Sequence, residues 1–318
     1  MISSILMKFE KWIYIFILSA LCNSVPSQAD NLPDNKIFTV GFAQDTLAND
    51  WRKAQVNDLR FELSKHANIK FVVTDAGGSS ARQIRDMEDL ANQKVDVLIT
   101  SPRNSAASTP AISRIYKQGI PVVLVTRSIL TDDFTSLIAP NDYQIASEAA
   151  DYIAEKLSGK GNVFVLRGVP TATTAIARTK GFVDTLKKHP GIKIVSIKNG
   201  NYLRSDAIRA TEKTLMEGLN FDALYAQSDS MASGARLALK KAGIAPEDKV
   251  IVGIDYIHEA QTAIRSGEQS ASFLYPTSAK ETAKIVIDIL AGKKVPKKVT
   301  VDSVKITKEN VDKINPIF

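Results

Sequence analysis

Residues 44–52 bring together side chains of the kinds that grip a small polar molecule. The aromatic ring of Trp51 and the guanidinium of Arg52 stand side by side in this segment. The polar groups in front of them are Gln44, Asp45, Asn49 and Asp50. An aromatic ring packs on the apolar C–H face of a sugar, and charged groups make strong hydrogen bonds to neighbouring hydroxyls. The segment therefore predicts a site for a flat-faced polar molecule, and a carbohydrate suits it well.

Matching polar groups follow later apolar runs. They are Thr126, Arg127, Thr173, Arg178, Ser228, Asp229 and Asp255. In an open parallel sheet, ligands bind outside the carboxyl ends of the strands, where loops and helix N-termini converge. Each residue also has a structural interpretation, because Asp, Ser and Thr cap helices, Arg178 could form a surface salt bridge and Trp51 could plug the core. Taken together, the set favours a cleft between two domains.

Patterns for catalysis and metal binding do not occur in the sequence. His66, His189 and His258 have no metal-ligand spacing, and there is no Gly-x-Ser-x-Gly elbow. The loop after the first apolar run lacks the glycine pattern of a dinucleotide site. Residues 77–80 could hold a phosphate at a helix start, but no Lys follows, so a plain turn is favoured. We expect a protein that is not an enzyme and has no metal or cofactor.

Short apolar runs alternate with amphipathic stretches along the chain. The first series predicts strands at 37–43, 70–74, 95–100 and 121–126, with helices near 50–66, 79–93 and 104–118. The second series predicts strands at 162–167, 192–197, 222–227 and 249–255, with helices near 173–189, 204–218 and 229–243. The runs are nearly continuous Val, Ile, Leu and Phe, as in parallel strands covered by helices on both faces. The chain thus predicts two α/β halves of similar size.

Further segments connect and complete these halves. Residues 137–142 are interpreted as a connection into a new helix, with Asn141 or Asp142 as its cap. After the second half, we expect a strand at 270–274, a helix at 277–290 and a strand at 298–304.

The N-terminal residues predict an exported protein. Two lysines precede an apolar run at 12–22, and Ser27-Gln28-Ala29 supplies small residues for cleavage after Ala29. The run is too short to span a bilayer. An uncleaved anchor and a buried helix are alternatives, and a lipoprotein attached at Cys22 is disfavoured because the preceding Leu21 is too large. Cleavage would remove Cys22, the single cysteine, so the mature chain would have no disulfide.

Composition and charge indicate an ordinary globular protein. The chain is 44% hydrophobic and 24% charged, and a chain of this length commonly divides into two domains. The net charge of +7 is spread along the sequence, which favours a solvated surface over a nucleic-acid site. We therefore expect no nucleic-acid partner. We also expect the protein to be a monomer.

Several motifs resemble those of the periplasmic sugar-binding proteins of the ribose-binding type, which serve ABC transporters. They are Val40-Gly41-Phe42 with its polar loop, Arg127-Ser128-Ile129, Arg178 with Lys180-Gly181-Phe182, the segment 225–231, and Val252-Gly253-Ile254-Asp255. The resemblance covers essentially the whole chain after the leader. The loop with Trp51-Arg52 and the segment 200–205 are most similar to the galactofuranose-binding branch.

The resemblance implies two doubly wound parallel-sheet α/β domains joined by a three-strand hinge, the Venus-flytrap or type I fold of periplasmic binding proteins. Residues 1–29 would form the signal peptide. Residues 37–141 with 276–297 would form the N-terminal domain, and residues 142–275 with 298–318 the C-terminal domain.

The same resemblance implies a function. A periplasmic protein of the Gram-negative type would capture a sugar or sugar-like ligand between its domains and deliver it to an ABC transporter permease. The alternative is a sensor that presents the ligand to a membrane receptor or histidine kinase. A DNA-binding repressor with the same core is disfavoured, because a signal peptide occupies the place of its DNA-binding helices.

Carried onto this sequence, the resemblance places six residues at the ligand, namely Trp51, Arg52, Arg127, Arg178, Asp229 and Asp255. The predicted site is completed by Gln44, Asp50, Thr126, Thr173, Ser228 and Tyr275. Tyr275 is either a ligand contact or a packed aromatic of the hinge.

Three residues depart from the family pattern. Thr126 stands where an Asp is usual, Ser228 where an Asn is usual, and Arg167 where a Gln is common. These exchanges remove one carboxylate and one amide and add a guanidinium, and an unmatched buried cation is costly. The departures favour the hypothesis that the ligand carries a carboxylate or phosphate that pairs with Arg127 or Arg167.

Overall fold

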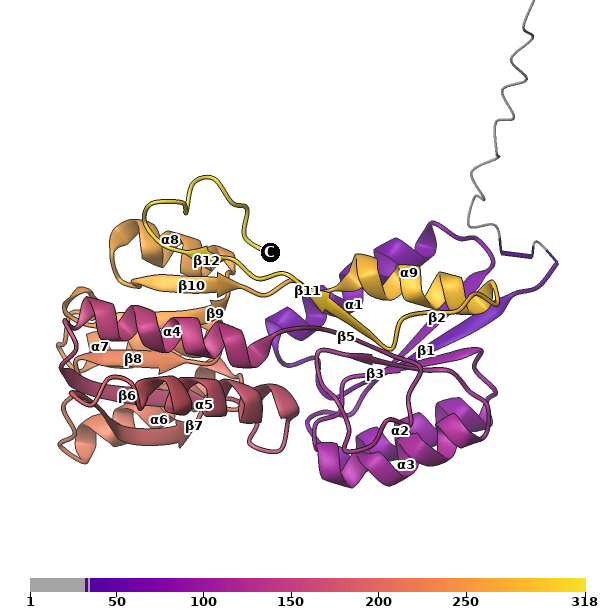
Figure 1. Cartoon of the computed structure of the whole chain (residues 1–318), viewed down its shortest axis with the longest axis horizontal. Helices are drawn as coiled ribbons and strands as arrows, with labels where there is room; N and C mark the ends of the chain where they lie inside the picture. Colours follow the sequence, from indigo (N-terminus) through magenta and orange to yellow (C-terminus); the bar gives the residue numbers. More distant parts are fainter. Residues whose placement is uncertain (1–31, 34) are drawn as a thin grey trace, which may run out of the picture.

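A computed structural model of the chain describes residues 32–33 and 35–318. The expected signal peptide, residues 1–29, lies outside these described residues. The described chain forms two α/β domains that lie end to end and are joined by three crossings of the chain (Figure 1). Within this part of the chain, no helix is long and apolar enough to cross a membrane.

The first domain is built on a six-stranded parallel sheet with the order β11-β5-β4-β3-β1-β2. Its strands are β1 (Phe38–Gln44), β2 (Ile69–Asp75), β3 (Val97–Thr100), β4 (Val122–Val125), β5 (Ser136–Pro140) and β11 (Lys298–Val301). Its helices pack as two pairs, one on each side of the sheet (Figure 1). The pairs are α1 (Asp50–Ser64) with α9 (Ala279–Leu290), and α2 (Ser80–Asn92) with α3 (Ser105–Lys117).

The second domain repeats this plan in the order β12-β10-β9-β8-β6-β7, in which only β12 is antiparallel to its neighbour. Its strands are β6 (Gly161–Arg167), β7 (Ile192–Asn199), β8 (Ala223–Ala226), β9 (Val250–Asp255), β10 (Ala271–Leu274) and β12 (Lys305–Ile306). Helix α4 (Asp142–Lys156) packs on α5 (Thr173–Leu186), and α6 (Arg204–Met216) on α7 (Asp229–Lys241). The turn η1 (Pro246–Asp248) and helix α8 (His258–Ser266) complete the domain.

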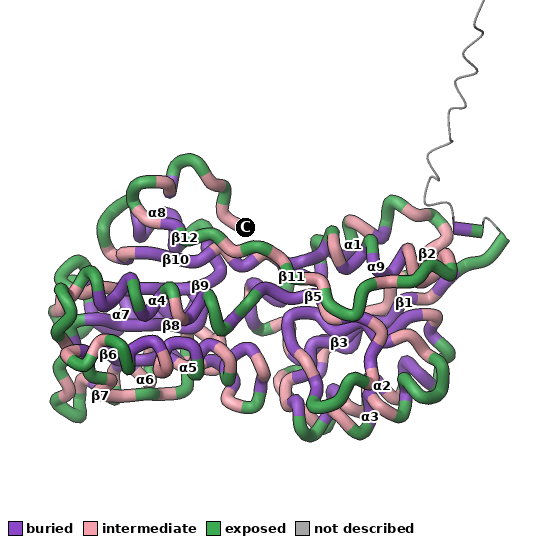
Figure 2. Tube along the Cα trace, in the orientation of Figure 1, coloured by how far each residue is buried: buried purple, intermediate pink, exposed green. Residues whose placement is uncertain are grey.

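The central strands form the core of each domain. Every residue of β3 (VLIT), β4 (VVLV) and β8 (ALYA) is buried, whereas the helices bury one face and expose the other (Figure 2). A strand that is covered on both faces needs apolar side chains at every position. This explains why the strands appear in the sequence as continuous apolar runs.

Both sheets share one order of their first five strands, β2-β1-β3-β4-β5 and β7-β6-β8-β9-β10. In this order the direction of winding reverses between β1 and β3, and again between β6 and β8. The loops on either side of such a reversal diverge and leave a crevice at the carboxyl ends of the strands. The fold therefore places one crevice in each domain.

Three segments cross between the domains and form the hinge. They are residues 140–142, 274–279 and 301–305, which connect β5 to α4, β10 to α9 and β11 to β12. Asn141 caps α4, as one of the two sequence alternatives expects, and its side-chain oxygen accepts a hydrogen bond from the backbone N–H of Gln144 at 3.2 Å.

The C-terminal segment corrects an expected domain boundary. Residues 298–304 are predicted as one strand of the C-terminal domain, but β11 pairs in parallel with β5 of the first sheet. Val299 and Val301 pack against the core of the first domain, so the first domain extends to Val301. The chain then crosses the hinge, and β12 pairs with β10.

Residues 136–140 also differ from expectation, since they form β5 rather than part of a connection. The run is short and ends in Pro140, so its pattern is that of a turn. Its pairing with both β4 and β11 makes it a strand.

Candidate functional site

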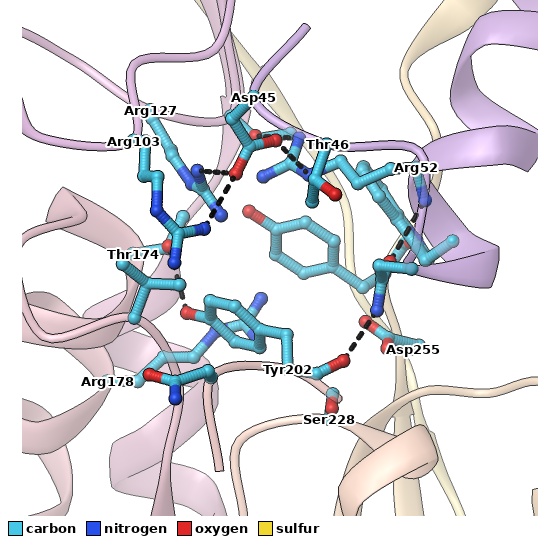
Figure 3. Close-up of a pocket in the computed structure, with 16 residues that line it drawn as sticks. Asp45, Thr46, Arg52, Arg103, Arg127, Thr174, Arg178, Tyr202, Ser228 and Asp255 are labelled. Atoms are coloured by element: carbon cyan, nitrogen blue, oxygen red, sulfur yellow. Dashed lines mark hydrogen bonds and ion pairs between the residues drawn. The ribbon is translucent and has the colours of Figure 1, made fainter. Parts of the chain in front are cut away.

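A pocket between the two domains is lined by 16 residues that come from both of them (Figure 3). The first domain contributes residues after β1, β3 and β4, and the second contributes residues from the ends of β6, β7, β8 and β9. The pocket leaves about 470 Å³ of space between protein atoms, including space open to solvent. Residues that are distant in sequence meet here because the carboxyl ends of both sheets face the domain boundary.

Two helix caps bring polar side chains to the pocket wall. Asn49 accepts a hydrogen bond from the backbone N–H of Arg52 at 3.0 Å and begins α1. Ser228 accepts one from the backbone N–H of Met231 at 3.3 Å and begins α7. Capping satisfies an otherwise free N–H group of the first turn. These residues thus have the structural role that their types predict, and the same role holds them at the pocket.

Asp45 is surrounded by three arginines in the first-domain wall (Figure 3). Arg127 Nη1 donates to Asp45 Oδ2 at 2.8 Å, Arg52 Nε lies 3.5 Å from Oδ1, and Arg103 Nη1 lies 3.8 Å from Oδ2. Burial alone would raise the pKa of Asp45, but Arg127 and Arg52 outweigh burial and hold this pKa below its ordinary value. Asp45 is therefore ionised at neutral pH and offsets one of the three positive charges.

Arg52 is held in place by hydrogen bonds within its own domain, including one of 3.4 Å to Thr126 Oγ1 in the pocket wall. Its Nη1 donates to Gln55 Oε1 at 3.1 Å and to Ser101 Oγ at 3.0 Å. Burial and the nearby charge of Arg127 lower the pKa of Arg52 to about 10, so the guanidinium stays charged at neutral pH.

Arg178 occupies the opposite wall, in the second domain. Its Nε donates to Asp142 Oδ1 at 2.7 Å, and its Nη1 donates to the carbonyl of Gln227. Tyr275 covers one face of the guanidinium, with 4.4 Å between the guanidinium carbon and the ring centre. The charge of Arg178 is thus matched within its own domain, and its planar fork is held in a defined orientation.

Two acidic residues lie one behind the other at the end of β9. Asp255 lines the pocket, whereas Asp229 lies behind it and accepts hydrogen bonds from Tyr256 N and Ser272 Oγ, both at 2.6 Å. Burial raises the pKa of Asp229 to about 6 and raises the pKa of Asp255 well above its ordinary value. The role of Asp229 is to order the turn that carries Asp255.

The aromatic groups of the pocket come from three segments. Trp51 Nε1 donates to the carbonyl of Tyr275 at 2.9 Å, and the two rings lie 5.6 Å apart. The ring of Tyr202 projects between Arg127 and Arg178, whose guanidinium carbons lie 5.7 and 5.9 Å from the ring centre. The flat apolar surface predicted for Trp51 is therefore shared with Tyr202, which comes from the opposite domain.

Hydrogen bonds join the domains on both sides of the pocket. Asn49 Nδ2 donates to the carbonyl of Tyr202 at 2.7 Å. Elsewhere, Thr171 Oγ1 donates to the carbonyl of Arg103 at 2.9 Å, and Ser128 N donates to Thr173 Oγ1 at 2.9 Å. The domains are thus closed on each other around the pocket.

Backbone strain is concentrated at the pocket wall. Thr126, Tyr202 and Asp255 have φ angles of 64°, 63° and 118°, in a region that non-glycine residues rarely adopt. Each such residue costs on the order of 1–3 kcal/mol, and such residues cluster at functional sites. Their side chains are therefore held in positions that ordinary strand ends would not provide.

Eight of the twelve residues predicted to bind ligand line the pocket, namely Trp51, Arg52, Thr126, Arg127, Arg178, Ser228, Asp255 and Tyr275. The other four lie away from it. Gln44 lies behind the wall, where its Oε1 accepts from Asp45 N at 2.9 Å, and Asp229 lies behind Asp255. Thr173 bonds to the backbone of the other domain, and Asp50 is on the outer side of α1 with 47% of its side chain exposed.

The sequence-based list omits eight residues that line the pocket, namely Asp45, Thr46, Asn49, Arg103, Val169, Thr174, Asn201 and Tyr202. Asp45 and Asn49 lie in the polar loop that the sequence singles out, and Tyr202 lies in the segment 200–205. Arg103 follows β3, so the strand-end rule applied to this third strand would have found it.

Two departures from the family pattern have structural explanations. The carboxylate that is missing at Thr126 is supplied by Asp45, which bonds to Arg127 from the end of β1. Arg167 does not line the pocket, because its Nε donates to Asn199 Oδ1 at 3.0 Å on the neighbouring strand β7. The expected pairing of a ligand anion with Arg167 is therefore not supported by its position.

A cleft lined by opposed strand ends of two hinged α/β domains is the design of a ligand-binding protein that closes around a small molecule. In the residues that the structure describes, no group of three or more His, Cys, Asp or Glu side chains could hold a metal ion.

Comparison with known proteins places the chain in a family. A family model described as a periplasmic binding protein domain matches residues 40–294, and the chain belongs to this family. It is 29% identical to the ribose import binding protein RbsB of Bacillus subtilis, over 90% of this chain and 93% of the relative. It is 31% identical to the galactofuranose-binding protein YtfQ of Escherichia coli, over 82% and 83%.

Among solved structures, the fructose-binding periplasmic domain of a hybrid two-component system matches with a TM-score of 0.83 and 30% identity. The match covers 86% of this chain and 92% of that one. These findings confirm the expected family and the type I fold.

Proposed function

We propose that the protein captures a sugar or sugar-like ligand in the interdomain cleft and delivers it to the permease of an ABC transporter. The observation that carries this proposal is the convergence of Arg127 and Trp51 from one domain with Arg178 and Tyr202 from the other. Guanidinium groups bind adjacent hydroxyls, and aromatic rings cover the C–H faces of a sugar. Relatives named for ribose import and for galactofuranose binding support a sugar as the ligand.

Ligand contacts come from both domains in this proposal. Trp51, Arg52 and Arg127 act from the first domain, and Arg178 and Asp255 act from the second. Thr126, Ser228 and Tyr275 complete the wall around them. The protein works as a monomer in the periplasm of a Gram-negative type of cell envelope, after removal of its signal peptide.

Closure of the hinge links binding to delivery. A ligand that touches both walls is bound more tightly by the closed arrangement than by an open one, so it shifts the population toward closure. The membrane partner recognises the closed form. The three short crossings of the chain, at 140–142, 274–279 and 301–305, are the segments that rotate.

Calorimetry and X-ray scattering on the purified protein test the proposal. We expect a ligand to bind with micromolar or better affinity, about 8 kcal/mol of binding free energy, and to reduce the radius of gyration at saturation. Failure of every neutral and acidic sugar to bind, together with an unchanged radius, would contradict the proposal.

A sensory role is the second candidate, because the structural neighbour described above is the periplasmic domain of a two-component system. In this case the closed protein signals through a membrane receptor or histidine kinase. A strain that lacks the gene separates the two candidates. Loss of uptake of the labelled ligand indicates transport, whereas intact uptake with a lost transcriptional response indicates sensing.

A further inference from the structure

The pocket contains more guanidinium groups than its carboxylates balance. Arg52, Arg103 and Arg127 surround the single carboxylate of Asp45, while Arg178 is paired with Asp142. Asp255 is the other carboxyl group that lines the pocket. Even if all three of these carboxyl groups are ionised, one of the four guanidinium charges remains unmatched. A buried charge without a partner is costly, so the excess points to a negative charge on the ligand.

The unused hydrogen-bond donors lie on the same side of the pocket as this excess charge. Arg127 is 1% exposed, and its Nε is buried without a partner. Its Nη1 is committed to Asp45. Among the described residues, none accepts a hydrogen bond from the guanidinium of Arg103, which reaches Asp45 only at 3.8 Å. The guanidinium groups of Arg103 and Arg127 thus both have hydrogen-bond donors free for a ligand.

Arg103 and Arg127 line the pocket together with the hydroxyl side chains of Thr174 and Tyr202. Figure 3 shows Arg103 and Arg127 next to Asp45, with Thr174 and Tyr202 below them in the view. Thr174 Oγ1 and the Tyr202 hydroxyl lie 3.0 Å apart, so this pair has a further hydroxyl proton to donate. Asp206 also attracts Arg103, but it is already bonded to Asn201 and Arg209.

We propose that the ligand is a sugar that carries an oxyanion, a carboxylate or a phosphate, and that this group lies against Arg103 and Arg127. The inference rests on the proposed sugar-binding function and assigns the chemical class of the ligand. Guanidinium forks bind carboxylate and phosphate oxygens in bidentate fashion. Asp45 holds Arg127 in place, and the oxyanion balances the charge that Asp45 leaves unmatched.

Calorimetry on the ligand-free protein tests the inference with matched sugars. The acidic probes are D-galacturonate, D-glucuronate and D-ribose 5-phosphate, and the controls are their neutral parents D-galactose, D-glucose and D-ribose. We expect at least one acid to bind tenfold or more tightly than its parent. The identity of that acid distinguishes a carboxylate from a phosphate.

Arg103→Gln tests the position of the oxyanion. Because the Arg103 guanidinium makes no hydrogen bond within the protein, this variant should keep its fold, which thermal unfolding verifies. It should weaken binding of the acid about 10- to 100-fold and weaken binding of the neutral parent much less. Arg103→Lys keeps the positive charge but loses the planar guanidinium. Its affinity for the acid should fall between the affinities of the wild type and of Arg103→Gln. Arg85→Gln, on the exposed face of α2, is the matched control and should bind as the wild type does.

Several results would overturn the inference. Neutral sugars that bind as tightly as the acids, or a panel in which no acid binds, would refute an acidic ligand. An unchanged affinity of Arg103→Gln for the acid would refute the position of the oxyanion. Binding of neutral sugars alone leaves the proposed function intact, whereas failure of both classes to bind removes the proposed function as well.

Discussion

Asn49, in the first domain, donates a hydrogen bond of 2.7 Å from its Nδ2 to the backbone carbonyl of Tyr202 in the second domain. The Oδ1 of the same side chain accepts from Arg52 N and caps α1. One amide group therefore begins a helix and also holds the closed cleft together. The two roles can be separated, because a serine caps a helix about as well as an asparagine but is too short to reach Tyr202.

Asn49→Ser should weaken ligand binding about 3- to 10-fold, since a neutral hydrogen bond contributes about 0.5–1.5 kcal/mol, while the melting temperature stays close to that of the wild type. Calorimetry and thermal unfolding measure the two effects. Asn104→Ser, at the cap of α3, is the matched control, because its side chain bonds to Ala107 N within its own helix. If Asn49→Ser and Asn104→Ser bound the ligand with equal affinity, the contact of Asn49 with Tyr202 would not stabilise closure.

Trp51 should report ligand binding by its fluorescence. Its indole lies between the guanidinium of Arg52, 5.1 Å from the ring centre, and the ring of Tyr275. The sequence has two tryptophans, Trp12 and Trp51, so removal of the leader leaves Trp51 alone. We expect a saturable change in emission with the same dissociation constant as calorimetry. Constant emission during a titration that calorimetry shows to be binding would place the ligand away from Trp51.

Gly168→Ala should reduce ligand affinity by displacing Tyr202. A Cβ at position 168 would lie 2.0 Å from Tyr202 Cζ, so the ring of Tyr202 must shift from its place in the pocket wall. We expect an affinity loss of about fivefold or more, because an aromatic contact and its burial together contribute more than 1 kcal/mol.

A double-mutant cycle with Tyr202→Ala tests this route. If the alanine at 168 acts through Tyr202, it should have little further effect once the ring is gone. Additive losses in the double variant would show that Gly168 affects binding in another way.

Loss of the proton from Asp229 should lower the free energy of unfolding as the pH rises. Burial raises its pKa from 3.8 to about 6 in the folded state, so the folded state holds this proton more tightly than the unfolded chain does. The resulting stabilisation is fully present below about pH 4 and is lost as the pH rises through about 6. The loss amounts to about 3 kcal/mol.

Urea unfolding of wild type and Asp229→Asn between pH 4 and 7 measures this contribution. The variant keeps one oxygen that can accept from Tyr256 N and Ser272 Oγ but loses the oxygen that accepts from Gln269 Nε2. This loss shifts its free energy of unfolding by an amount that does not depend on the titration of Asp229. The difference between the two proteins should change by about 2 kcal/mol across this range, because part of the titration lies outside it. A difference that stays constant with pH would mean that Asp229 titrates normally in the folded state.

Most strands and helices could be predicted from the sequence because their signals are local. Continuous apolar runs mark strands that are covered on both faces, and Asn or Ser before an amphipathic stretch marks a helix start. β5 was not predicted as a strand and β11 was predicted in the wrong domain, because the place of each depends on pairing that is distant in sequence. Pairing between residues about 160 positions apart leaves no local pattern to read.

The binding site, like the fold, could be predicted from the sequence only in part. The sequence by itself determined which side chains lie at strand ends, because the alternation of apolar runs and helices sets where each strand stops. Only the tertiary structure decided which of these side chains meet. It turned Asp50 outward, placed Asp229 behind Asp255, and brought Asp45 to Arg127 in place of the acid expected at Thr126.

The physical reason is that direction and distance across a cleft depend on how two sheets twist and how three hinge segments cross, and no single segment of sequence encodes these quantities. Tyr202 shows this most clearly. Its position between Arg127 and Arg178 depends on a left-handed backbone conformation, on the absence of a side chain at Gly168 and on a hydrogen bond from Asn49 in the other domain.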